Sequence, residues 1–92
     1  MVDEIERRLV QILAKSIVPE VDATTLTPET PLVEGGLNLD SVKLLELIVG
    51  AEEAFGVVID DAELSLGLIE RIGSLADFFR QKLNASGRTL AG

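Results

Sequence analysis

Apolar side chains recur at three- and four-residue intervals near both ends of the chain, which is the spacing of one face of an α-helix. This pattern predicts a first helix over residues 2–16, ended by Pro19, and a last helix over residues 74–84. Ser74, followed by Asp77, is typical of a capping box at the start of the last helix. The residues of these two helices expected to face the core are Val2, Ile5, Leu9, Ile12, Leu13, Leu75, Phe78, Phe79 and Leu83.

The middle of the chain predicts another helix, over residues 40–55, with Asp40 as its N-cap and Gly56 just beyond its last turn. At about 100° per residue, its apolar side chains fall on two sides of the helix instead of one. The side expected to face the core carries Leu44, Leu47, Ile48, Ala51 and Phe55. The other side, which we call the outer stripe, carries Val42, Leu45 and Val49 and is flanked by Glu46, Glu52 and Glu53.

The outer stripe lies close to Ser41 and has two interpretations. An exposed apolar strip bordered by acids fits a docking surface for partners with basic, partly apolar patches. The same spacing also fits side chains that neighbouring loops cover. Periodicity favours neither interpretation, so the exposure of these side chains in the folded protein decides between them.

Residues 17–39 contain three prolines and no alternating pattern, so they are expected to form a long loop. A loop of this length is unusual in a small domain and often has a function. Its expected anchors on the core are Leu26, Leu32, Val33 and Leu37.

Three short segments complete the expected architecture. Residues 57–59 are β-branched but have no second strand to pair with, so a loop is expected. Residues 61–71 predict a short third helix, weakened by Gly67, and residues 85–92 predict a flexible C-terminal tail. The third helix is expected to turn Leu64, Leu68 and Ile72 inward. The fold class is therefore all-α: a small four-helix bundle, with three main helices and the short third one, over residues 1–84.

The charge of the chain limits its partners. Its 92 residues include 16 acids and 8 bases, for a net charge of −8, and 47% of them are hydrophobic, enough for one small core. Residues 40–64 hold seven acids and one base, a balance of −6, which repels nucleic acid and attracts basic protein surfaces. No stretch has the apolar length of a membrane span, and the charged N-terminus does not resemble a signal peptide. We therefore expect a cytoplasmic protein that binds neither nucleic acid nor membrane.

Ser41, beside Asp40 at the start of the middle helix, is the conspicuous candidate for chemistry. A nucleophilic serine needs an activating base, and the chain has no His, Cys or Tyr. Lys43 faces another side of the helix, and Asp40 is too weak a base, so catalysis by the chain itself is not expected. No metal site is expected either, since no segment has the acid spacing of a calcium loop. The N–H groups at a helix start favour a phosphate on Ser41, although Asp-Ser at this position is commonly only a cap.

The wider pattern around Ser41 is distinctive. It runs from Leu32 through Gly36-Leu37-Asn38-Leu39-Asp40-Ser41-Val42 and continues through residues 44–47 and 52–61 to Gly73-Ser74-Leu75. This pattern resembles the Asp-Ser-Leu phosphopantetheine attachment site of acyl carrier proteins and its surroundings. With the order of elements included, the resemblance covers roughly residues 2–84.

The resemblance implies a carrier and not an enzyme. Ser41 is similar to the serine that receives 4′-phosphopantetheine from coenzyme A, after which the thiol of this arm carries an acyl group as a thioester. Asp40 is similar to the acid before that serine, which is associated with the transferase and its magnesium. The implied partners of the monomer are a phosphopantetheinyl transferase and acyl-loading, acyl-transferring or condensing enzymes. The residues that fall where the family's recognition helix meets such enzymes are Val42, Leu45, Glu46, Val49, Glu52 and Glu53.

The chain departs from the family pattern at several positions. Val42 replaces the commoner Leu, and Lys43 stands where many fatty-acid carriers have an acid. Asn38 stands where Gly is frequent, and asparagine tolerates the left-handed backbone conformation better than most residues. The stretch over residues 62–72 is longer than in compact fatty-acid carriers. We therefore expect a carrier of a polyketide or other specialised pathway. The chain begins at Met1 and contains nothing else, so it is also expected to be free-standing. Two alternatives stay open: a carrier of fatty-acid synthesis, and a small acidic helical adaptor without a prosthetic group.

Overall fold

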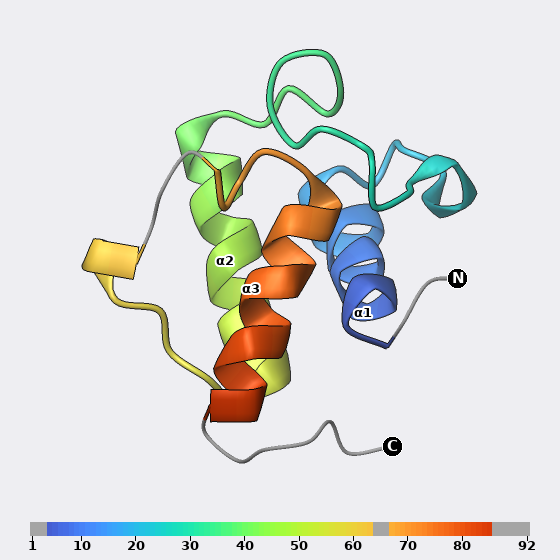
Figure 1. Cartoon of the computed structure of the whole chain (residues 1–92). Coiled ribbons are helices and arrows are strands. Elements are labelled where there is room, and N and C mark those ends of the chain that lie inside the picture. The colour runs from blue at the N-terminus through green and yellow to red at the C-terminus, as the bar shows by residue number, and fades with distance from the viewer. Residues whose placement is uncertain (1–3, 64–66, 86–92) are drawn as a thin grey trace.

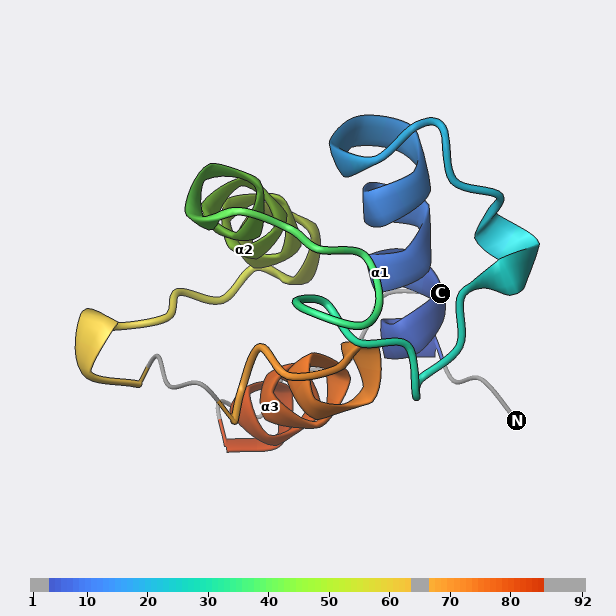
Figure 2. The same cartoon turned by 90° about the horizontal axis from the view of Figure 1, so that it is seen from above.

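Three α-helices form a bundle in the computed structural model, which describes residues 4–63 and 67–85 (Figures 1 and 2). The described α-helices are α1 (Glu4–Ile12), α2 (Ser41–Phe55) and α3 (Ile72–Ala85). The helix α1 packs against both others, and Figure 1 shows α2 and α3 running in one direction and α1 in the opposite one. None of the described helices is long and apolar enough to cross a membrane. The predicted all-α bundle is confirmed.

Aliphatic side chains fill the space between the helices, and the rings of Phe55 and Phe79 meet with their centroids 5.1 Å apart. No polar or charged residue is buried within the described part of the chain. The predicted core residues found buried in the helical segments are Ile5, Leu9, Leu13, Leu47, Ile48, Ala51, Phe55, Leu75, Phe79 and Leu83. Of the others, Ile12, Leu44 and Phe78 lie half-buried against this core, and Val2 lies outside the described residues.

The first helical segment has two parts. After α1 the chain continues as a π-helical turn, η1 (Leu13–Ile17), in which Val18 N donates to Leu13 O at 2.7 Å. The segment ends just before Pro19, as predicted, because a proline removes a backbone donor. The change from α to π geometry had no signal in the hydrophobic pattern.

The long loop lies across the end of the bundle at which α2 begins (Figure 1). It contains one 3-10 turn that was not predicted, η2 (Ala23–Thr25), capped by Asp22, whose carboxylate accepts from Thr24 N at 2.9 Å. The predicted anchors Leu26 and Leu32 are buried, and Leu37 packs half-buried on the core. Val33 is half-buried, and Leu39 is a buried anchor that was not predicted.

The predicted third helix is wrong over residues 67–71, which are not helical. Within the described part of residues 61–71, the helical structure is one 3-10 turn, η3 (Asp61–Glu63). A longer helix does not form because the end of this segment pairs with the long loop: Leu32 N donates to Glu70 O at 3.1 Å. Of the residues predicted to face inward, Leu68 and Ile72 are buried, and Leu64 lies outside the described residues.

The last helix begins two residues earlier than predicted, at Ile72, and ends at Ala85. Ser74 is therefore not the N-cap: it lies inside the helix, and its Oγ accepts from Arg71 N at 3.0 Å. The predicted capping box with Asp77 is wrong for the same reason. Residues 86–92 of the predicted tail lie outside the described residues.

Candidate functional site

Ser41 is the first residue of α2 and is exposed. Asp40 is the N-cap, as predicted: its backbone is extended and its Oδ1 accepts from Lys43 N at 2.8 Å. This bond satisfies one of the N–H groups that a helix start leaves without an intrahelical partner. The positive end of the helix dipole lies at the same place, so an anion attached to the Ser41 hydroxyl is favoured.

The loop leading to Ser41 is fixed by its own backbone. Asn38 adopts a left-handed conformation (φ 52°), which asparagine tolerates better than most residues, as expected for this position. The next residue, Leu39, is buried, and its N–H donates to Leu32 O at 3.0 Å. A Cβ on Gly36 would lie 2.2 Å from Pro31 O, so the turn requires glycine.

The same loop is tied to the entrance of α3. Ile72 N donates to Thr30 O at 3.1 Å, and Gly73 N donates to Pro28 O at 2.8 Å. A Cβ on Gly73 would lie 2.9 Å from Pro28 O, so the two segments approach closely. Ser41 therefore follows a loop that backbone hydrogen bonds hold to the start of α3, and we call this segment the braced loop. The sequence predicted the length of this loop but not that it pairs with the start of α3.

The outer stripe is exposed. Val42, Leu45 and Val49 expose 63%, 58% and 43% of their surface, whereas the residues on the opposite side of α2 form part of the core. The described loops do not cover the stripe, so the prediction of two different apolar sides on α2 is confirmed.

The acids beside the outer stripe differ in their surroundings. Glu46 and Glu53 are exposed. Glu52 is half-buried, and its Oε2 accepts from Ile59 N at 2.6 Å. Its carboxylate thus holds the segment after α2 against the helix, a contact that the sequence did not reveal.

Val58 belongs to that segment and was not among the predicted site residues. It exposes 73% of its surface, although Val57 and Ile59 on either side of it are buried. Residues 57–59 form a loop, as predicted, and follow Gly56, whose left-handed backbone (φ 71°) ends α2. All three residues of this triplet are apolar, so the sequence carried no signal that Val58 alone would be exposed.

Lys43 lies on a different side of α2 and has an internal partner. It is half-buried, and its Nζ donates to Ile17 O, the last residue of η1, at 3.1 Å. At the other end of the helix pair, Arg8 of α1 donates to Ala54 O of α2 at 3.4 Å. Each base therefore meets the C-terminal end of the opposite helical segment, where the carbonyls carry partial negative charge.

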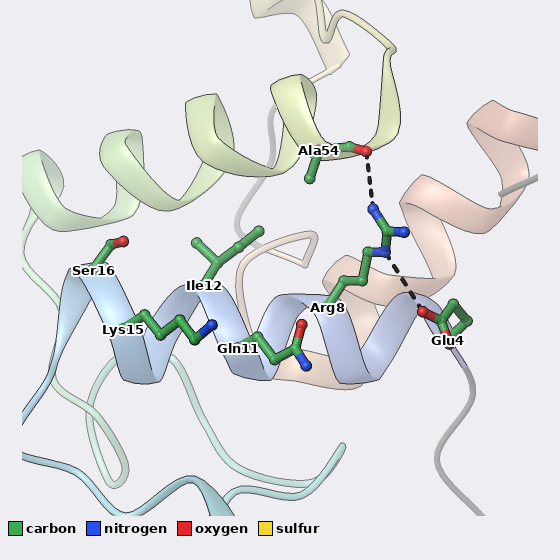
Figure 3. A pocket seen from close by; sticks show the side chains of 7 residues that line it. All are labelled: Glu4, Arg8, Gln11, Ile12, Lys15, Ser16 and Ala54. Carbon is green, nitrogen blue, oxygen red and sulfur yellow. Dashed lines mark hydrogen bonds and ion pairs between the residues drawn. The ribbon is translucent and has the colours of Figure 1, made fainter. Parts of the chain in front are cut away.

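A shallow groove of about 350 Å³ runs between α1 and α2 (Figure 3). Figure 3 shows Arg8 at this groove, bridging Ala54 and Glu4. A Cβ on Gly50 would lie 3.3 Å from Ile12 Cγ2, a tight contact, so the two helices approach closely at this glycine. The groove includes neither Ser41 nor the outer stripe: its lining residues are Glu4, Arg8, Gln11, Ile12, Lys15, Ser16 and Ala54. The described residues also form no cluster of acids that could hold a metal ion.

Comparison with known proteins identifies the family. Residues 7–79 match the family described as phosphopantetheine attachment site. The chain is 36% identical over 72 residues to an acyl carrier protein of Thermotoga maritima, an alignment that covers 75% of this chain and 85% of the relative. This chain belongs to the acyl carrier protein family.

Two further comparisons agree with this result. An acyl carrier protein of Desulforapulum autotrophicum is 40% identical over 57 residues, which are 62% of this chain and 71% of the relative. The solution NMR structure of a holo acyl carrier protein from Nitrosomonas europaea matches with a TM-score of 0.77 at 30% identity, covering 89% of this chain and 99% of that one. Acyl carrier proteins are carriers with a covalently attached 4′-phosphopantetheine and not enzymes, so both of these predictions are confirmed.

Proposed function

We propose that Ser41 is the residue to which the 4′-phosphopantetheine arm of this carrier protein is attached. The observation that supports this most directly is the place of Ser41: an exposed hydroxyl at the first position of a capped helix, at the end of a braced loop. A phosphodiester formed there meets the N-terminal end of α2, which favours negative charge. The arm supplies the thiol that carries an acyl group as a thioester.

The residues around Ser41 present the hydroxyl but do not activate it. Asp40 uses one carboxylate oxygen to cap Lys43 N, and its second oxygen is the group we assign to the magnesium of the transferase. The chain has no histidine, and Lys43 Nζ is engaged with Ile17 O. The transferase must therefore supply the base that removes the proton from Ser41.

Intact-mass measurement tests the attachment. The chain is incubated with coenzyme A and a broad-specificity phosphopantetheinyl transferase, and we expect a gain of one arm per chain. Ser41→Ala should abolish the gain, whereas Ser16→Ala, which removes an exposed hydroxyl from η1, should leave it unchanged. Labelling that persists in Ser41→Ala would contradict the assignment.

We also propose that the outer stripe and its acids form the surface on which partner enzymes dock. Its exposure supports this, since three apolar side chains in water gain by contact with a partner. The balance of −6 over residues 40–64 supports basic partner surfaces. The partners are the transferase and the acyl-loading, acyl-transferring or condensing enzymes.

We further propose that this carrier serves a polyketide or other specialised pathway, as a cytoplasmic monomer whose carrier domain comprises residues 1–84. The long stretch over residues 62–72 and the base at position 43 support a dedicated carrier. The test supplies the holo chain to the malonyl-loading and condensing enzymes of bacterial fatty-acid synthesis. We expect much slower elongation than on a fatty-acid carrier; equal rates would assign the chain to fatty-acid synthesis.

A further inference from the structure

We propose that the docking surface of this carrier continues beyond α2 onto Val58, and that its occupant is a basic partner protein with an apolar pocket at this point. The inference rests on the proposed function of the outer stripe and extends that surface to a second element. Val58 then contributes to the choice of partner through a contact that α2 alone does not provide.

Few large apolar side chains are exposed in the described part of the chain, and most of them form the outer stripe. The large hydrophobic residues exposed there are Val42, Leu45, Val49 and Val58. Val58 exposes the greatest fraction of these, 73%. A single exposed valine is ordinary, but one that follows the helix bearing the outer stripe can enlarge that apolar patch into a contact surface.

The position of Val58 is held firmly. Val57 and Ile59 are buried on either side of it, so Val58 cannot turn inward without exposing one of them. Both neighbours are bonded to Glu52: Val57 N donates to Glu52 O at 3.2 Å, and Ile59 N donates to Glu52 Oε2 at 2.6 Å. Glu52 follows Leu45 by two helical turns and so shares the side of α2 that carries the outer stripe. Figure 1 shows this segment leaving the C-terminal end of α2.

The dimensions agree with one continuous surface. At about 1.5 Å per residue, the 15 residues of α2 span roughly 22 Å from Ser41 to Phe55. A specific protein–protein interface covers about 800 Å² on each partner, a patch roughly 30 Å across. A partner centred on the outer stripe therefore reaches Ser41 at one end and Val58 at the other.

Charge selects the kind of partner. Glu53 and Asp60, both exposed, lie before and after Val58 in the chain. An apolar side chain between acids fits a basic surface with an apolar pocket. A second copy of this chain does not fit, because two molecules of net charge −8 repel each other.

Arm transfer to Ser41 by a broad-specificity phosphopantetheinyl transferase tests the inference. We expect Val58→Asn to raise the KM about fivefold, since an apolar contact at the end of the surface is lost, and Val58→Lys to raise it further. Val58→Leu should leave the KM nearly unchanged. The control Gln81→Lys places the same charge on an exposed position of α3 and should have little effect. The kcat should stay constant because Ser41 and its cap are intact.

An unchanged KM in Val58→Asn and Val58→Lys would show that docking ends with α2 and would overturn the inference. A lower melting temperature in Val58→Asn would also overturn it, by showing that this residue supports the fold. Labelling that persists in Ser41→Ala would instead contradict the assignment of Ser41. The two proposals therefore fail in distinguishable ways.

Discussion

Adjacent residues of α2 have opposite environments. Ile48 is buried in the core, whereas its neighbour Val49 exposes 43% of its surface on the outer stripe. The sequence predicted this difference because side chains one position apart point about 100° apart on a helix. The difference gives a direct test of the two-sided helix.

An aspartate at position 48 should lower the free energy of unfolding much more than an aspartate at position 49. Ile48→Asp buries a charge without a partner and should lower the free energy of unfolding by about 3 kcal/mol or more. Val49→Asp leaves its charge in water and should lower it by less than about 1 kcal/mol. Thermal or urea unfolding measures both variants. Similar losses in the two would mean that Val49 belongs to the core.

Conformations that depend on a residue's own chemistry were predictable. Asp40 caps α2, Gly56 ends it, and Asn38 adopts the left-handed conformation, all as the sequence indicated. The contacts of Lys43 and Glu52 were not predictable. Lys43 reaches a carbonyl 26 residues earlier in the chain, and a helical wheel does not show which segment lies beside it.

Elements of this bundle are joined by charged side chains at their ends. Lys43 Nζ meets the carbonyl of Ile17 at the end of η1, and the guanidinium of Arg8 meets the carbonyl of Ala54 near the end of α2. These two contacts join α2 to the first helical segment, α1 with η1, at opposite ends of the pair. The first also fixes the turn of α2 that bears Ser41.

Removal of the Lys43 contact should loosen this pair. Lys43→Met keeps the aliphatic stem but loses the donor, so the free energy of unfolding should fall by about 1 kcal/mol. Lys43→Arg keeps a donor and a positive charge, so it should retain most of the stability that the Lys43 contact contributes. Urea unfolding measures both. If both variants match the native chain, the Lys43–Ile17 bond adds no stability.

A second charged contact joins η3 to α3. Lys82 Nζ lies 2.6 Å and 2.9 Å from the two carboxylate oxygens of Glu63. The hydrogen bond from Lys82, together with one from Asp60 N, lowers the pKa of Glu63. A carboxyl group whose pKa is lower in the folded chain than in the unfolded chain stabilises the fold when the pH is above its unfolded-state pKa. This stabilisation is lost as the pH falls through its folded-state pKa.

The contribution of Glu63 should therefore be sensitive to acid. Glu63→Gln should have a lower melting temperature than the native chain at neutral pH, because the ion pair with Lys82 is lost. The difference should shrink as the pH falls below about 4.3, the ordinary pKa of glutamate, and vanish in stronger acid. Melting curves at several pH values give this comparison. A difference that stays constant across the series would mean that the carboxylate charge of Glu63 does not matter.

The elements were predictable where their stability comes from their own periodicity. The main helices lie close to the predicted ranges because each buries a stripe of its own side chains. The predicted third helix failed because Glu70 accepts a hydrogen bond from Leu32, and Ile72 donates one to Thr30. Such pairing between distant segments replaces local helix formation and leaves no periodic signal in either segment.

At the scale of the whole molecule, the proposed functions occupy different places. The proposed attachment site lies at the start of α2, where the braced loop leads into the helix, and the proposed docking surface lies along α2. The groove between α1 and α2 includes neither of them. A partner bound to the outer stripe therefore approaches the arm without displacing the contacts that join the helices.

The net charge of −8 should make encounter with basic partners depend on salt. Exposed charges are screened over about 10 Å at 0.1 M salt and over about 3 Å at 1 M. The kcat/KM for arm transfer to Ser41 should therefore fall as salt rises. Glu46→Lys reverses an exposed charge beside the outer stripe, so it should lower kcat/KM at low salt and approach the native value at high salt.

The control variant is Glu20→Lys, which makes the same change of net charge at an exposed position of the long loop. It should slow arm transfer less than Glu46→Lys does, because the charge near the contact matters more than the total charge. Lys43→Glu is a poor substitute, since it also breaks the bond to Ile17 O. Equal effects of Glu46→Lys and Glu20→Lys would mean that only the total charge steers the partner. Rates independent of salt and of both substitutions would mean that docking is apolar and that the acids of α2 serve solubility.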